Sequence, residues 1–314
     1  MIGNIFFTLN IVAPVFVIVF LGIILKKIFF IDSHFLESSS NLVFKISMPA
    51  LVFLAISRCS PADVFRWSDL GLVYGGTILF FLLAWWIAGF ISADPKSQAS
   101  FTQGCFRSNF AIIGLPLIKN WLGSDALSHA ALLLSMIMPL YNILAVLALT
   151  IPLQQSFHPQ KIIKEILTNP LIIATVLGLL FATIPIPLPQ IALETLDSLA
   201  DLTFPLSLLG IGASLNFSHF KSNRVMVMTA VLIKTILIPL VLTSVAWLLN
   251  DRGDHLAILF ILFSAPTAVA SFMMAKAMDA DFQLAATIVV TATLTSVFSI
   301  SAGIFIMKSF NLLG

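Results

Sequence analysis

Charge is scarce in this chain: charged residues make up only 10% of its 314 residues, whereas hydrophobic residues make up 59%. Soluble domains carry about 25% charged and about 45–50% apolar residues. A chain with so few charges cannot cover a water-facing surface. Its mean hydropathy of +1.07 likewise indicates a strongly apolar protein. We therefore expect the protein to lie in a lipid bilayer.

Other absences narrow the classes of function. The 16 Lys and Arg residues are scattered and leave a net charge of +2, without the basic stripe that nucleic acid requires. The sequence contains no Gly-Lys-Ser/Thr phosphate loop, so ATP is not expected to drive the protein directly. Cys59 and Cys105 lack metal-ligand spacing and are expected to be free, buried thiols. The five histidines also lie far apart in sequence, so we expect neither a metal nor a cofactor.

Long apolar runs are what the chain has instead. A spanning helix needs about 20 mostly apolar residues to cross about 30 Å of hydrocarbon. Ten stretches qualify: 7–28, 36–57, 69–92, 97–120, 124–152, 166–185, 190–214, 224–249, 255–278 and 281–307. The first is too long for a signal peptide and is followed by two lysines, so it is expected to stay as a span. The pattern predicts an all-α integral membrane protein of ten helices.

The two halves of the chain share features at one constant offset. An ungapped shift of 156 residues aligns Pro14 with Pro170, Gly22 with Gly178, Pro49 with Pro205, Ser108 with Ser264, and Asp125 with Asp281. This predicts a five-helix repeat in 1–153 and a second in 154–314. Because five is odd, the second repeat should be inverted in the membrane, an arrangement typical of secondary transporters.

The distribution of basic residues favours an orientation. If the N-terminus lies outside, the inner loops hold eight cations: Lys26, Lys27, Lys96, Lys161, Lys164, Lys221, Arg224 and Lys276. The outer segments then hold five: Arg58, Arg66, Lys119, Arg252 and Lys308. The positive-inside rule therefore favours both termini outside the cytoplasm.

Two predicted helices carry helix-breaking residues at mid-span. In 97–120, Gly114 and Pro116 follow a polar segment, and in 255–278 Pro266 lies between Ser264 and Thr267. Proline removes a backbone donor, and nearby polar side chains can satisfy the freed carbonyls. Unwound segments expose N–H groups at the positive ends of half-helices, which suits a carboxylate. Matching breaks in two halves favour a transporter binding site, the alternative being simple proline kinks, which are common in membrane helices.

The run from Arg107 to Pro116, Arg-Ser-Asn-Phe-Ala-Ile-Ile-Gly-Leu-Pro, resembles a signature of the auxin efflux carrier family. So do 265–270, Ala-Pro-Thr-Ala-Val-Ala, and the Thr-rich 291–296. The resemblance implies a five-plus-five fold shared with bile-acid/sodium symporters, with crossed fourth and ninth helices. Helices 1, 2, 6 and 7 would form a scaffold and helices 3–5 and 8–10 a transport domain that moves like an elevator. Bacterial members resemble carriers of malonate, malate and other organic anions. The chain lacks the long central loop of the plant carriers, so auxin itself is not implied.

The substrate-binding candidates follow from these motifs. They are Arg107, Ser108, Asn109, Gly114, Pro116, Ser264, Pro266 and Thr267. Guanidinium binds carboxylate bidentately. Arg107 and Asn109 lie two residues apart and can reach one ligand only if the helix between them is unwound.

Ionisable residues within the spans are functional candidates because burying them in lipid costs about 2.5–3.5 kcal/mol on insertion scales. Lys45 and Asp201 each lie four residues before a repeat-matched proline, so they are candidates for a charge pair across the pseudo-two-fold axis. Lys234 has Ile78 as its repeat equivalent. It is either a functional charge or a satisfied structural one.

The sequence favours a secondary carrier that moves a small organic anion, a carboxylate by preference. Its expected location is the plasma membrane, which is the inner membrane in a Gram-negative cell, with a homodimer through the scaffold helices as a further expectation. A passive channel is the alternative, but it would need a continuous polar lining, and helices this apolar offer little of one. An intramembrane enzyme would have only Asp197 and Asp201 as paired acids. The predicted crossing region contains no carboxylate, so we expect that sodium is not obligatory.

Overall fold

The computed structural model describes residues 2–58, 66–153, 167–168, 170–184, 188–214 and 223–312. Within these ranges the helices are joined by short turns and connections, and the only β-structure is one isolated β-bridge. This confirms the all-α fold class. The predicted repeat boundary, between residues 153 and 154, lies at the edge of a described range. Cys59 lies outside the described residues. Cys105 is free and buried.

The helices of the first half are α1 (Ile2–Lys27), α2 (Ser33–Leu42), η1 (Val43–Ser47), α3 (Met48–Ser57), α5 (Trp67–Ile91), α6 (Pro95–Phe106), η2 (Phe110–Gly114) and α7 (Leu115–Thr150). Those of the second half are α9 (Pro170–Thr183), α10 (Gln190–Asp201), α11 (Thr203–Ser214), α12 (Arg224–Leu232), η3 (Ile233–Leu237), α13 (Ile238–Leu248), α14 (Gly253–Ser264), α15 (Val269–Ala277) and α16 (Phe282–Ser309). Each of the ten predicted stretches contains helix.

Six helical segments of the described chain are long and apolar enough to cross a membrane. They are 33–57, 67–91, 110–150, 190–213, 224–248 and 282–309, and two shorter apolar helices lie at 172–183 and 253–264. A multi-pass membrane protein is therefore supported. The count of ten spans and the inversion of the second repeat stay predictions.

Three π-helical turns interrupt the helices, and each ends two residues before a proline. The π turns η1, η2 and η3 precede Pro49, Pro116 and Pro239, each the second residue of the next α-helix. In each case the first residue of that helix donates its N–H to the carbonyl five residues earlier. A proline ring clashes with the carbonyl four residues before it. The wider turn lets the helix continue through the proline.

The helix α7 combines the end of the predicted span 97–120 with nearly all of the predicted span 124–152. Its backbone leaves the helical region at Gly123, where φ is 85°. Residues with a Cβ rarely adopt this conformation, so the glycine allows the kink. The break between the two predicted spans is confirmed.

Two glycines allow α1 and α11 to cross with their backbones in contact. A Cβ added at Gly22 would overlap the carbonyl of Leu209, and one at Gly212 would overlap the carbonyl of Val19. The repeat partner of Gly22, Gly178 in α9, packs against α3 less closely, because an added Cβ there would lie 3.0 Å from the Ile56 side chain. Both glycines matched by the repeat therefore lie at helix contacts, but only Gly22 lies against backbone within overlap distance.

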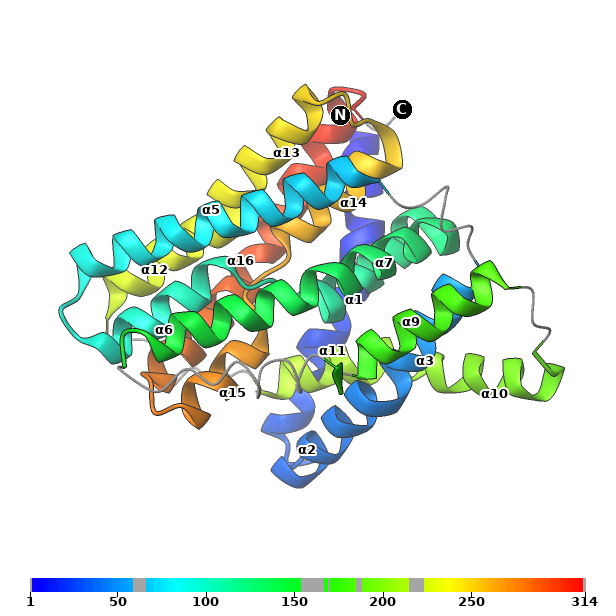
Figure 1. Ribbon diagram of the computed structural model, residues 1–314, viewed down its shortest axis with the longest axis horizontal. Helices are drawn as coiled ribbons and strands as arrows, with labels where there is room; N and C mark the ends of the chain where they lie inside the picture. Colours follow the sequence, from blue (N-terminus) through cyan, green and yellow to red (C-terminus); the bar gives the residue numbers. More distant parts are fainter. Residues whose placement is uncertain are drawn as a thin grey trace.

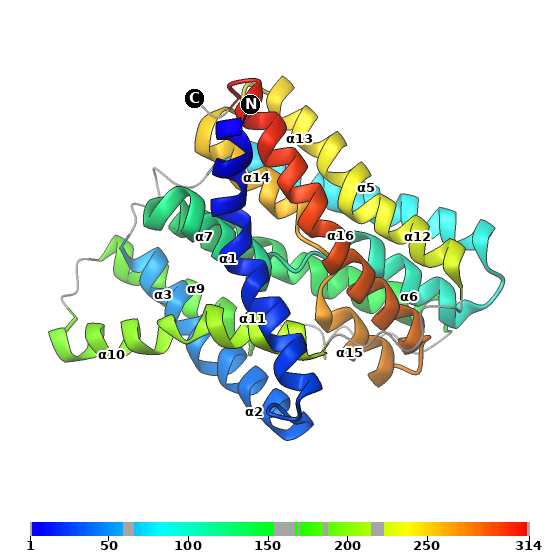
Figure 2. The ribbon, with the colours of Figure 1, turned by 180° about the vertical axis from the view of Figure 1, so that it is seen from behind.

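The helices form two groups with α7 between them (Figures 1 and 2). In one group α1 and α2 contact α11, while α9 and α10 contact α3. In the other, α5 contacts α6, α12 and α13, while α16 contacts α6, α12, α14 and α15. The helix α7 contacts members of both groups, including α3 and α14.

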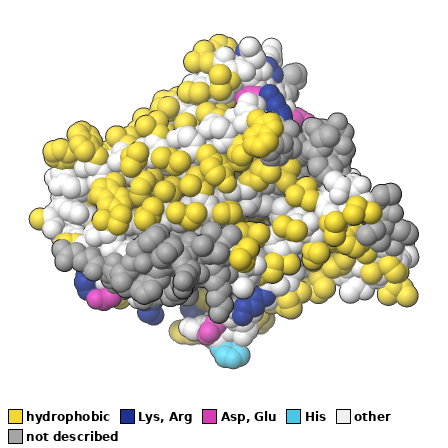
Figure 3. Space-filling view, viewed as in Figure 1, with side chains coloured by type: hydrophobic (Ala, Val, Ile, Leu, Met, Phe, Trp, Pro, Cys, Tyr) yellow, Lys and Arg dark blue, Asp and Glu magenta, His cyan; other side chains and the backbone are white. Residues whose placement is uncertain are grey.

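An apolar surface covers the outer side of α5 and of α12–α13. The exposed large side chains of α5 include Leu79, Leu82, Trp86 and Phe90, and those of α12–α13 include Val225, Met228, Leu232, Ile236 and Leu240. Their three- and four-residue spacing places each set on one helix face. On the face of the molecule that carries α5, hydrophobic side chains spread widely, while charged ones gather near the edges (Figure 3). Such a face suits contact with lipid rather than water.

Candidate substrate site

The two predicted broken helices meet where each loses its helical structure. Ser108, just after the end of α6, forms an antiparallel β-bridge with Thr267, just after the end of α14. The N–H of Asn109 donates to the carbonyl of Pro266 at 2.7 Å, and the N–H of Ala268 donates to the carbonyl of Arg107 at 3.2 Å. The predicted break and crossing of these helices are confirmed.

Hydroxyl groups hold the crossing together. The Ser108 hydroxyl donates to the carbonyl of Leu262 at 2.9 Å, and the Thr267 hydroxyl donates to the carbonyl of Gly104 at 2.6 Å. Both acceptors lie in the last turn of a helix, where carbonyls lack helical partners. The Ser264 hydroxyl lies 3.5 Å from the carbonyl of Ile261, within its own helix. Substrate contact by these three hydroxyls stays a prediction.

Buried polar atoms near the crossing have no hydrogen-bond partner in the described structure. They are Nδ2 of Asn109, Oε1 of Gln103 and Oγ of Ser271. Buried polar groups are usually satisfied, and leaving one unpaired costs about 1–3 kcal/mol. A polar ligand at the crossing would supply these partners.

Arg107 is buried beside these groups. Its guanidinium donates to Sδ of Met274 at 2.7 Å and to Oδ1 of Asn142 at 3.1 Å. Gln103 also reaches Sδ of Met274, at 3.8 Å. A thioether is a weak acceptor. Among the described residues, no carboxylate forms an ion pair with Arg107.

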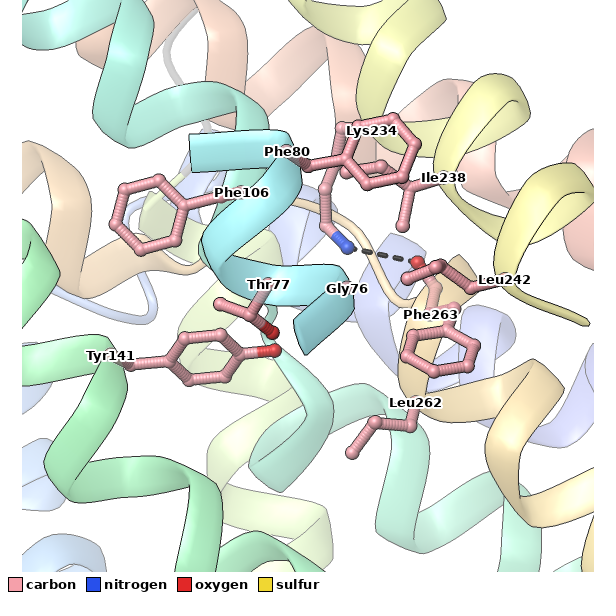
Figure 4. A pocket seen from close by; sticks show the side chains of 10 residues that line it. All are labelled: Gly76, Thr77, Phe80, Phe106, Tyr141, Lys234, Ile238, Leu242, Leu262 and Phe263. Atoms are coloured by element: carbon pink, nitrogen blue, oxygen red, sulfur yellow. Dashed lines mark hydrogen bonds between the residues drawn. The ribbon is translucent and has the colours of Figure 1, made fainter. Parts of the chain in front are cut away.

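The second buried cation is Lys234, with only 1% of its surface exposed. It comes from η3, and its Nζ donates to the carbonyl of Phe263 at 2.9 Å, one residue before the end of α14 (Figure 4). A cation is favourable at the negative end of a helix. No described carboxylate forms an ion pair with Lys234 either.

Lys234 lines a small cavity between α5, α6, α7, α13 and α14 (Figure 4). The hydroxyls of Thr77 and Tyr141 point toward each other on its other side (Figure 4). The cavity holds about 10 Å³. This is about the space that one water molecule needs.

Two further candidates, Gly114 and Pro116, have packing roles in the structure. The ring of Phe110 lies against Gly114 so closely that an added Cβ would overlap it. Pro116 is the second residue of α7, directly after the π turn η2, whose wider turn accommodates the proline ring. Substrate contact by Gly114 and Pro116 stays a prediction.

The proposed charge pair between Lys45 and Asp201 is wrong. Asp201 lies 3.7 Å from Lys119 instead, and Lys45 is exposed on the π turn η1. Asp197 pairs with Arg58 at 2.8 Å. The repeat placed Lys45 and Asp201 at matching sequence positions, but only the packed helices determine which charges meet.

Sequence reasoning also missed residues that the fold brings together. Gln103, Asn142 and Met274 surround Arg107, and only Asn142, a polar residue inside an apolar run, gave a signal. The histidines lie far apart in sequence, yet His129 and His255 stack with ring centroids 4.7 Å apart beside Asp69. These three residues come from three helices, so no sequence spacing could have shown them.

The apolar helices, the paired helix breaks and the buried cations together define a multi-pass membrane protein of the transporter class. A family model described as membrane transport protein matches residues 7–160 and, a second time, residues 154–304. The chain belongs to this family, the auxin efflux carrier family, and the double match agrees with an internal repeat.

Curated relatives carry the same description. An uncharacterized transporter of Methanothermobacter thermautotrophicus is 24% identical over 294 residues, which cover 92% of this chain and 95% of the relative. An uncharacterized transporter of Methanocaldococcus jannaschii is 22% identical over 296 residues, covering 91% and 94%. The family and both relatives are described as transporters.

Proposed function

We propose that this protein is a secondary carrier that moves a small organic anion, most simply a carboxylate, across the plasma membrane. The single observation that carries the proposal is the burial of two cations, Arg107 and Lys234, beside crossed, unwound helices without a described carboxylate partner. An unpaired buried charge is costly, and an anionic ligand would compensate it.

Neutral groups next to Arg107 fit the same ligand. The amide of Asn109 and the hydroxyl of Ser271 can donate hydrogen bonds, and both lack partners in the described structure. The sulfur of Met274, which accepts from Arg107, is a far weaker acceptor than a carboxylate oxygen. A carboxylate can therefore displace this contact favourably.

The size of the cavity beside Lys234 favours a carrier over a channel. With room for about one water molecule, it cannot hold a dicarboxylate or conduct ions in this conformation. Substrate entry therefore requires helices to move. This requirement is typical of alternating access, in which a site opens to one side at a time.

The two helix groups fit an elevator-type movement, in which one group moves against the other. The crossing and both buried cations belong to the group of α5, α6 and α12–α16 together with α7. The group of α1–α3 and α9–α11 would act as the scaffold. Movement of the first group against the second would carry the anion across the bilayer.

The test is a binding screen followed by a transport assay. We expect mono- or dicarboxylates to raise the melting temperature of the purified protein, and the best of them to show counterflow in proteoliposomes. Arg107→Gln should weaken binding roughly 10- to 100-fold, because hydrogen bonds to a charged group contribute about 1.5–3 kcal/mol.

Arg224→Gln is the matched control, because Arg224 is exposed at the start of α12. It should leave the affinity unchanged. Binding of neutral or cationic solutes with no carboxylate effect would refute the anion proposal. Ion currents without counterflow would favour the passive pore.

A further inference from the structure

Asp69, His129 and His255 form a cluster apart from the crossing. Asp69 lies in the first turn of α5, His129 in α7, and His255 near the start of α14. The Nε2 atom of His255 lies 2.7 Å from Oδ1 of Asp69, and that of His129 lies 3.4 Å from Oδ2. One ligand atom from each residue lies within 4.8 Å of the others.

Burial and unmade hydrogen bonds mark this cluster as more than an ion pair. The side chain of Asp69 is fully buried, and those of the two histidines are 14% and 13% exposed. Oδ2 of Asp69 and Nε2 of His129 face each other, yet neither has a hydrogen-bond partner in the described structure. A buried carboxylate oxygen and an imidazole nitrogen therefore lie 3.4 Å apart without a well-formed hydrogen bond between them.

We propose that Asp69, His129 and His255 bind a transition-metal ion of the zinc type. Two imidazole nitrogens and one carboxylate oxygen are ligands that zinc uses, whereas calcium and magnesium prefer oxygen alone. A tetrahedral ion with bonds of about 2.0–2.2 Å holds its ligand atoms about 3.3–3.6 Å apart. The 3.4 Å between His129 and Asp69 already fits, whereas the stacked rings of His129 and His255 must rotate so that both Nε2 atoms face the ion.

A fourth ligand position is available. Oδ1 of the buried Asp251 lies 3.6 Å from Nε2 of His255 and 3.0 Å from the guanidinium of Arg66. Either this oxygen, released from Arg66, or a water molecule can complete the coordination. The bound ion would join α5, α7 and α14, which carry or contact the crossing.

The experiment uses the full chain in detergent, purified through a tag without histidine. We expect one Zn²⁺ per chain by calorimetry, a higher melting temperature with Zn²⁺, and visible d–d absorption of tetrahedral Co²⁺ that Zn²⁺ displaces. Asp69→Asn, His129→Gln and His255→Gln should each weaken Zn²⁺ binding at least about tenfold. His34→Gln is the matched control, because His34 is exposed in α2.

A conservative variant separates metal binding from a structural role. His129→Cys keeps a zinc ligand, so it should retain Zn²⁺ binding and add a thiolate-to-metal band to the Co²⁺ spectrum. Loss of binding in His129→Cys while the protein stays monodisperse would contradict a ligand role for this position. Wild-type protein without Co²⁺ absorption, or variants that bind as tightly as wild type, would overturn the proposal and leave a hydrogen-bonded cluster.

Discussion

Single side chains at the crossing differ in whether their hydrogen bonds are made within the protein. Ser108 and Thr267 donate to helix-end carbonyls, so they stabilise the unwound backbone. The Asn109 amide has no such partner, although its backbone N–H is bonded to Pro266. Residues next to each other in sequence therefore have different roles: Ser108 supports the fold, whereas we assign Asn109 to the ligand.

Asn109→Ala should weaken carboxylate binding by about 0.5–1.5 kcal/mol, because one neutral hydrogen bond to the ligand is lost. The melting temperature without ligand should change little, since the side-chain amide makes no bond in the described protein. Thermal shift with and without substrate measures both quantities.

Ser108→Ala provides the contrast for that experiment. It leaves the carbonyl of Leu262 without its hydroxyl donor, so the melting temperature itself should fall. Equal transport rates in Asn109→Ala and wild type would show that the crossing only packs helices.

At the scale of the helices, prolines and glycines decide where the chain bends. Each described π turn precedes a proline, and glycines allow the close approach of α1 and α11. Lys234 lies in the π turn η3. Pro266 lies in the unwound segment after α14, where its carbonyl accepts a hydrogen bond from the N–H of Asn109. The residues that interrupt helices therefore also position the candidate site.

Pro266→Ala should reduce transport while the melting temperature stays the same or rises. The substitution restores an N–H that can bond within a continuous helix, which lets α14 extend into the crossing and withdraws free N–H groups from the anion. A strained functional segment commonly shows this exchange of activity for stability. Counterflow rates measured beside melting curves test it, and wild-type transport in this variant would contradict our site.

Gly212→Ala should destabilise the protein by about 1–3 kcal/mol through overpacking, because the new Cβ meets the backbone of α1 rather than a flexible side chain. Gly210→Ala is the matched control two residues away, where nothing lies within 4 Å of the added atom. Melting temperatures of the two variants in the same detergent give the comparison. Equal values would mean that α1 and α11 cross less closely than described.

At the scale of the whole molecule, an apolar outer surface encloses two helix groups. The exposed apolar faces of α5 and α12–α13 suit lipid, and the family model matches the chain twice. Inversion of the second repeat would place its helices upside down relative to the first. The homodimer through the scaffold helices stays a prediction.

Cysteine labelling tests the inversion. Cysteines introduced at Asp32 and Gln190, the latter close to Pro187, follow the first and sixth predicted helices in a background without Cys59 and Cys105. If the second repeat is inverted, a membrane-impermeant reagent added to intact cells should modify only one of the two positions. Equal labelling of both would contradict the inverted repeat.

Sodium should not be obligatory for transport. A hard cation favours sites that contain carboxylates, and the described crossing offers amides and hydroxyls, with Ser108 and Thr267 already donating to carbonyls. Uptake into proteoliposomes should persist when potassium or choline replaces sodium. Complete loss of uptake would show sodium coupling.

Composition and periodicity predicted most of the helices because few kinds of backbone structure can span a bilayer. Low charge and long apolar runs require spanning helices, since lipid satisfies no backbone polar group. The prolines at 116 and 266 predicted the helix breaks, and the family signature was carried by the same segments. Arg107 and Lys234 were predicted as embedded cations, and both are buried.

Only the tertiary structure decided which side chains meet. Lys119 rather than Lys45 reaches Asp201, Met274 and Asn142 contact Arg107, and three distant helices bring Asp69, His129 and His255 together. The physical reason is that helix periodicity fixes neighbours three and four residues apart, whereas contacts between helices depend on crossing angle, rotation and depth. Those variables are set by close packing at a few glycines and by the π turns before prolines, and no sequence spacing records them.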